Sequence, residues 1–197
     1  AHAYIKNETP DYYLQHYRSN HYQWENDFNK TLRFYIGGEV AYPTQWVKPK
    51  LKVAFENITQ HIYFDENGLP KQMEGNIQIL AADLQLNITT PWVNLDNSVV
   101  YQHSSSEYIP LPALTLYNNL YYHGTWVKAL DVQIGVDMRL FTKYYAPVLN
   151  PALGQFCVQN VEKVGNYPVM NVYANFYVKH IRLKLFAQYQ HFNASFM

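Results

Sequence analysis

Between Leu130 and Leu140 the side chains alternate strictly between apolar and polar, and this period of two restricts the possible folds more than any other feature. The apolar set is Leu130, Val132, Ile134, Val136, Met138 and Leu140, and the residues between them are Asp131, Gln133, Gly135, Asp137 and Arg139. Because successive side chains of a β-strand point to opposite faces, the stretch predicts a strand with one apolar face and one polar, charged face. Its length also suits a tilted strand that crosses a bilayer in roughly 9–11 residues.

The same alternation recurs along most of the chain, whereas helical periodicity is scarce. The pattern predicts about eight strands, at Leu32–Tyr42, Val47–Glu56, Leu80–Ile88, Val93–Tyr101, Leu114–Tyr122, Leu130–Leu140, Met170–Val178 and Ile181–Tyr189. No run of about 18 apolar residues occurs, so the sequence predicts no transmembrane helix. We therefore expect an all-β protein.

The links between these strands are short and long in turn. Outer-membrane barrels show this alternation, with short periplasmic turns and longer extracellular loops. We therefore predict an antiparallel up-and-down transmembrane β-barrel, with residues 1–197 as one β-barrel region. Within it, residues 1–30 are a loop or the end of a preceding strand, 31–192 hold the strands, and 193–197 begin a loop. Short turns in the periplasm would leave both chain ends outside, so we expect this chain to be part of a larger barrel.

Three of the four tryptophans lie in or beside the short links, namely Trp46, Trp92 and Trp126. An indole ring is partly apolar and partly polar, and it favours the boundary between membrane and water. We expect these three residues to form an interface girdle at one membrane level.

Composition excludes several other classes of protein. Charged residues make up 15% of the chain, below the roughly 25% of soluble domains, and 19 residues are tyrosine. The formal net charge is +0, so no basic excess points to nucleic acid. The single cysteine, Cys157, can form no internal disulfide, and neither His nor an acid stands beside it to activate the thiol.

Charged residues of both signs fall on the polar face of the predicted strands. A charge facing lipid is costly, so we predict that they line a pore: Arg33, Glu39, Lys50, Lys52, Glu56, Asp83, Asp131, Asp137, Arg139, Arg182 and Lys184. Lys48, Lys50 and Lys52 form a ladder with two interpretations. It is either a solvated sheet face or the wall of a lumen that attracts anions.

Patterns that would indicate catalysis or a metal centre are weak. His16 and His21 are the closest pair of loop histidines, and a polar loop explains them better than a metal site. Asp131 and Asp137 would lie roughly 20 Å apart on one strand, too far for an acid–base pair. We expect no enzyme activity, no catalytic residues, no cofactor and no metal.

Four segments carry a resemblance to a known family. They are Tyr12–His21, Thr142–Pro147, Asn150–Phe156 and Gly165–Val169. In order and spacing they resemble the C-terminal half of the putative porin family of Bacteroidota outer membranes, over nearly the whole chain from Tyr12 to Phe196. The resemblance implies a barrel more strongly than it implies a transported solute, and it supplies no catalytic residues.

Together these features predict a porin-like pore in the bacterial cell outer membrane that lets small polar solutes diffuse. Its expected partners are outer-membrane lipid and these solutes, with a homo-oligomer or other outer-membrane proteins as further possibilities, but not nucleic acid. Two alternatives remain open. One is a non-conducting structural or ligand-binding barrel of the outer membrane, and the other is a soluble β-sheet binding protein.

Overall fold

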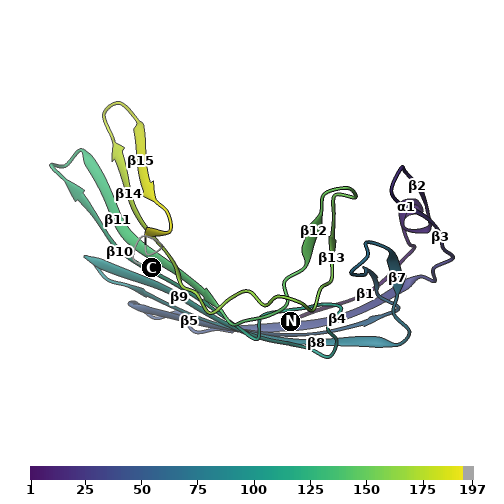
Figure 1. The fold of residues 1–197 in the computed structure, drawn as a ribbon. Coiled ribbons are helices and arrows are strands. Elements are labelled where there is room, and N and C mark those ends of the chain that lie inside the picture. Colours follow the sequence, from purple (N-terminus) through teal and green to yellow (C-terminus); the bar gives the residue numbers. More distant parts are fainter. Residues whose placement is uncertain (193–197) are drawn as a thin grey trace.

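The computed structural model describes residues 1–192 and is dominated by a nine-stranded antiparallel sheet (Figure 1). Its strands are β1 (His2–Glu8), β4 (Thr31–Ala41), β5 (Val47–Thr59), β8 (Asn76–Thr89), β9 (Val93–Ser104), β10 (Leu114–Trp126), β11 (Leu130–Phe141), β14 (Val169–Val178) and β15 (Leu183–Tyr189). Each strand pairs with its neighbour in this order, so the sheet is a meander. The predicted all-β antiparallel fold is confirmed.

The sheet curves strongly but does not close into a barrel (Figure 1). Its two edge strands, β1 and β15, each pair on one side within the described residues. Residues 2–8 add a ninth strand to the eight expected, in a stretch where a loop or the end of a strand was predicted. The predicted start of a loop at residues 193–197 lies outside the described part of the chain.

The links sort by length, as the sequence predicted. The short ones are residues 42–46, 90–92, 127–129 and 179–182, and they join strands at one end of the sheet. The long ones are residues 9–30, 60–75, 105–113 and 142–168, at the opposite end. The two ends are named here the short-turn end and the loop end.

The long links contain small elements of their own. They are α1 (Tyr12–Gln15), β2 (His16–Arg18), β3 (Gln23–Glu25), β6 (Ile62–Phe64), β7 (Pro70–Gln72), β12 (Val148–Asn150) and β13 (Gln155–Cys157). Strands from two links combine into a four-stranded sheet of order β12-β13-β6-β7, named here the loop-end sheet. Its central pair is parallel and joins Cys157 to Phe64. The loop-end sheet stands on the concave side of the large sheet (Figure 1).

The small hydrophobic core lies where the long links cover the large sheet. Ile58 on β5 and Ile77 on β8 are direct cross-strand partners, and their exposed fractions are 2% and 0%. Ile58 borders a cavity of about 330 Å³ that His61, Ile62 and Ile109 from the long links also line. Few other side chains of the large sheet are buried, and Val132 of β11 is among them. Within residues 1–192, no helix is both long and apolar enough to cross a bilayer.

Candidate functional site: the polar concave face

The pairing register divides the residues of the large sheet between two faces. Directly opposed residues of neighbouring strands share a face, because side chains alternate along each strand. One row of such partners crosses six strands: Lys48, Asn87, Asp96, Asn119, Asp137 and Asn171. Every second residue on each strand belongs to the same face as this row. The result is one continuous face, the inner face, which is mainly polar except at the loop end, where Ile58 and Ile77 lie.

Ten of the eleven residues predicted to line a pore lie on this inner face. They are Arg33 and Glu39 of β4, Lys50, Lys52 and Glu56 of β5, Asp83 of β8, Asp131, Asp137 and Arg139 of β11, and Lys184 of β15. Arg182 is the exception, since it lies in the short link after β14 with a positive φ of 52°. The turn there takes up residues 179–182, so the strand begins at Leu183 and not at Ile181.

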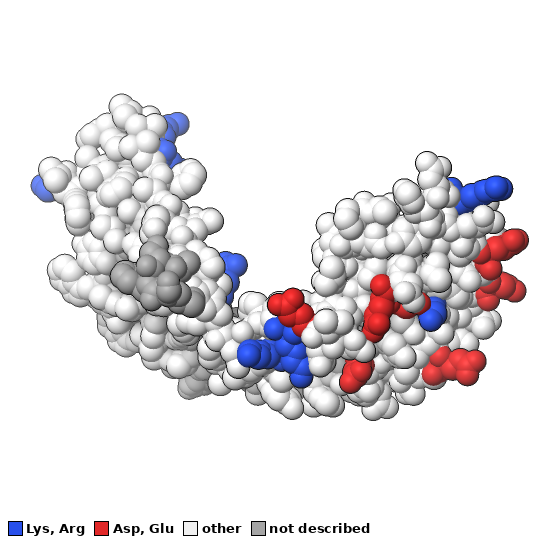
Figure 2. Space-filling model, in the orientation of Figure 1, with Lys and Arg blue, Asp and Glu red and all other residues white. Residues whose placement is uncertain are grey.

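Several of these charges neutralise one another across neighbouring strands. Arg33 binds Glu56 through two nitrogens, with Nη2 2.7 Å and Nε 2.8 Å from Oε1. Lys50 lies 3.0 Å from the Glu39 carboxylate, and Lys52 lies 3.8 Å from that of Asp83. The pairs lie around β4, β5 and β8, and Figure 2 shows charges of both signs on the floor of the hollow.

The opposite part of the inner face has a different chemistry. Asp137 is 8% exposed and forms no ion pair within the described chain, but it accepts a 2.8 Å hydrogen bond from Asn171 Nδ2. The Tyr173 hydroxyl donates to Asn119 Oδ1 at 2.9 Å. This region around β9 to β14 is rich in amides and phenols, whereas the region around β5 holds paired charges of both signs.

Near the short-turn end, the inner face is hollowed. A cavity of about 700 Å³ spans strands β10 to β15, and its polar lining includes His123, Gln133, Asn175 and Lys184. Asp131 also borders it and pairs with Lys179 of the adjacent turn at 2.9 Å. Apolar side chains, including Phe176, Leu185 and Phe186, line the rest of the cavity.

The opposite face of the sheet, the outer face, is apolar and open to the surroundings. Leu120 and Ile134 in the middle of β10 and β11 are 52% and 40% exposed. Val132 is the exception among the outer residues of β11, since it is fully buried with Phe176 as its partner on β14. A water-soluble protein would ordinarily cover so large a continuous apolar face.

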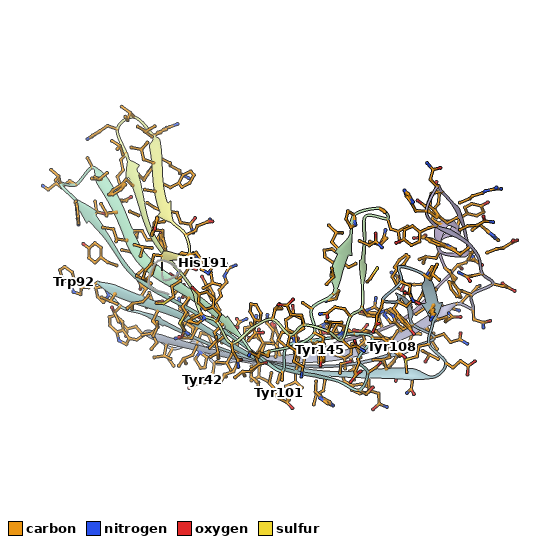
Figure 3. The ribbon with its side chains drawn as sticks, in the orientation of Figure 1. Tyr42, Trp92, Tyr101, Tyr108, Tyr145 and His191 are labelled. Carbon is orange, nitrogen blue, oxygen red and sulfur yellow. The ribbon has the colours of Figure 1, made fainter. Side chains whose placement is uncertain are left out.

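The three tryptophans predicted to form a girdle all lie at the short-turn end. Trp46 and Trp92 are in short links, Trp126 ends β10, and all three are exposed (Figure 3 labels Trp92). The carbonyl of Trp46 accepts a 2.8 Å bond from the Thr89 amide, and the Trp126 indole donates to the Tyr122 hydroxyl at 3.1 Å. The three rings therefore come from strand ends at the same edge of the sheet.

The loop end offers no metal-binding cluster among the described residues. No group of three or more His, Cys, Asp or Glu residues there could hold a metal ion. Cys157 is a free, buried thiol, and burial raises its pKa. Burial raises the pKa of Asp65, but bonds from Lys71 and from the backbone amides of Leu69 and Asn67 outweigh it and hold that pKa below its usual value.

Sequence reasoning missed several residues of the inner face. Asp96 and Asn119 lie in the same row as Asp137, yet neither was predicted to line a pore. The signal was the alternation in Val93–Tyr101, where Asn94, Asp96 and Ser98 occupy every second position. Asn97 interrupts the apolar set of that stretch and so weakens the pattern.

A comparison with protein-family models finds one with the description "Putative porin", which matches residues 1–197. A comparison with curated proteins finds no match to the chain.

Proposed function

Since the chain belongs to the family described as "Putative porin", which matches its full length, we propose that it forms part of a pore in a bacterial outer membrane. In this proposal the curved sheet is a section of a closed barrel wall. The outer face meets lipid, and the inner face lines a water-filled passage for small polar solutes. The barrel has no catalytic role and needs no cofactor.

The observation that carries the proposal is the separation of the two faces across nine strands. Ten of the eleven charged residues predicted to line a pore share the inner face with Lys48 and Asp96, while residues such as Leu120 and Ile134 leave the outer face apolar and exposed. This arrangement matches transmembrane barrels, whose strands alternate apolar-out and polar-in. It also weighs against a soluble β-sheet binding protein, which would expose that apolar face to water.

The girdle and the link lengths support an orientation. Trp46, Trp92 and Trp126 would lie at one membrane–water boundary, next to the short turns. Short turns face the periplasm in bacterial barrels, so the loop-end sheet would lie on the extracellular side.

A second function, a non-conducting barrel, is favoured by one observation. The long links cover part of the inner face so closely that Ile58 and Ile77 are almost fully buried there. Loops that fold over a lumen can narrow or close it.

Electrical recording separates the two functions. The intact protein, purified in detergent and inserted into a planar bilayer, should conduct ions in stepwise openings. Liposomes that contain it should also swell in small sugars but not in large dextrans. Stable insertion with neither conductance nor swelling would favour the non-conducting barrel, and solubility without detergent would favour the soluble protein.

A further inference from the structure

The apolar outer face carries two carboxamides near its middle. Asn97 on β9 and Asn118 on β10 are direct cross-strand partners. Their neighbours on the same face, along the two strands and across to β8 and β11, are all apolar: Leu86, Leu95, Val99, Leu116, Leu120 and Met138. The other outer-face amides of β5 and β8, Asn57, Asn76 and Gln78, lie at the loop end of the sheet. Asn97 and Asn118 are therefore two polar side chains surrounded by apolar ones.

The sheet supplies hydrogen-bond partners for only one of these two side chains. Asn97 Nδ2 donates to the backbone oxygen of Leu86 at 3.2 Å. The Asn118 side chain has no hydrogen-bond partner within residues 1–192. The backbone groups around it are taken up by the ladders to β9 and β11. In hydrocarbon, a carboxamide without partners is costly, because lipid chains offer neither donors nor acceptors.

We propose that this part of the outer face, over β8 to β11 and centred on Asn97 and Asn118, is an interface between two copies of the chain within the membrane. A carboxamide is both donor and acceptor, so the pair complements an identical pair in a second copy. A two-fold interface needs such a self-complementary patch. Lipid headgroups are a poorer match, since apolar residues flank the pair on both sides along each strand.

The neighbouring residues suit the same occupant. Met138, beside Asn118 in the row, has a flexible side chain that fits irregular contacts. Four strands about 4.8 Å apart, over an apolar band about 25 Å tall, offer roughly 500 Å² on each copy. Two copies would together bury roughly 1,000 Å², which reaches the size expected of a specific interface. The inference rests on the proposed location in a membrane.

Cysteine cross-linking in intact outer membranes tests the interface directly. In a Cys157→Ser background, Val99→Cys, which keeps both carboxamides and lies on the same face of β9, should form a disulfide-linked dimer on mild oxidation, because equivalent residues meet near a two-fold axis. Val53→Cys is the matched control, since Val53 is 45% exposed on the same face but lies on β5, outside the patch. The control should stay monomeric.

Removal of the carboxamides tests their role. In a mild detergent, Asn97→Leu and Asn118→Leu together should lower the dimer fraction, measured by light scattering, at least tenfold. Leucine suits a lipid-facing position, so the folded yield should not fall. Asn76→Leu, which changes an outer-face asparagine at the loop end, should leave the dimer unchanged.

The possible outcomes are distinguishable. A protein that inserts and conducts but whose Val99→Cys variant remains monomeric would overturn the interface and leave the pore intact. Cross-linking of Val99→Cys to a different protein would also overturn the proposal of a second copy. A protein that never enters the outer membrane would overturn both the interface and the pore.

Discussion

The ring of Tyr173 lies over Gly135, its cross-strand partner, so closely that a Cβ atom on Gly135 would stand 2.7 Å from Tyr173 Oη and from Tyr121 Cβ. The Tyr121 Cβ is attached to the backbone of β10, so it can move away only if the strand itself shifts. We therefore expect Gly135→Ala to lower the free energy of unfolding by about 1–3 kcal/mol. Urea titration of the protein in detergent micelles measures this. Gly38→Ala is the control, since its Cβ would meet only Ala1, at 4.0 Å, and equal stability of both variants would contradict the prediction.

Adjacent residues on β11 should differ sharply in their tolerance of charge. Ile134 faces outward near the middle of the strand, and Ile134→Arg should cost roughly 2–4 kcal/mol on refolding into lipid vesicles. Gln133 faces inward and forms long hydrogen bonds with Tyr173 and Asn175. Because Gln133→Arg removes only these bonds, it should lower the free energy of unfolding by about 1 kcal/mol. For each variant, the folded fraction is measured by electrophoresis of unheated samples, and the free energy of unfolding follows from it. Similar losses for the two variants would argue against a strand embedded in a membrane.

Reversing two charges on β5 should change ion preference. Lys50→Glu with Lys52→Glu removes two cations beside Glu39 and Asp83, so that part of the inner face would become strongly acidic. The reversal potential under a KCl gradient should then shift toward cation selectivity, because charges that line a pore set its preference. Lys128→Glu, in the short link after β10, serves as the control and should have little effect. An unchanged reversal potential in the double variant would place β5 outside the conduction path.

The loop-end sheet should lose local stability in acid through Asp65. Its carboxylate pairs with Lys71 at 2.9 Å and accepts 2.9 Å bonds from the Asn67 and Leu69 amides. Its pKa is held below 3.8, so the stabilisation is complete above about pH 4 and is lost as the pH falls through the lowered value. Asp65→Asn should therefore reduce the hydrogen-exchange protection of the Leu69 amide several-fold at pH 7. The difference between variant and parent should shrink as the pH falls through the lowered pKa, and a difference independent of pH would exclude the carboxylate as its source.

The alternation of side chains was enough to predict the large sheet. Strands such as β11 cover ten or more residues, and one face is apolar over the whole length, so the period and the two faces of each strand follow from the sequence. The strands of the loop-end sheet have three residues each, as in Ile62–Phe64, and a period of two cannot be recognised over so few positions. Their pairing joins links that are far apart in sequence, so only the tertiary structure determines it.

The alternation also predicted which residues lie on the inner face, but it misplaced Arg182 and did not predict the ion pairs. Arg182 was assigned to a strand because Ile181 continues the apolar alternation of β15, but the turn needed four residues. The ion pairs of Arg33 with Glu56 and of Lys52 with Asp83 depend on the register between strands. The length of the links limits that register but does not fix it.

The antiparallel order of the nine strands has a consequence for closure. Neighbours run in opposite directions, so β1 and β15, the first and ninth, run the same way, from the short-turn end to the loop end. Direct pairing of these two edges would create a parallel seam, and so would end-to-end pairing with a second copy in the same orientation. A cylinder with antiparallel neighbours throughout has an even number of strands. Such a cylinder therefore needs an odd number of strands to bridge β15 back to β1.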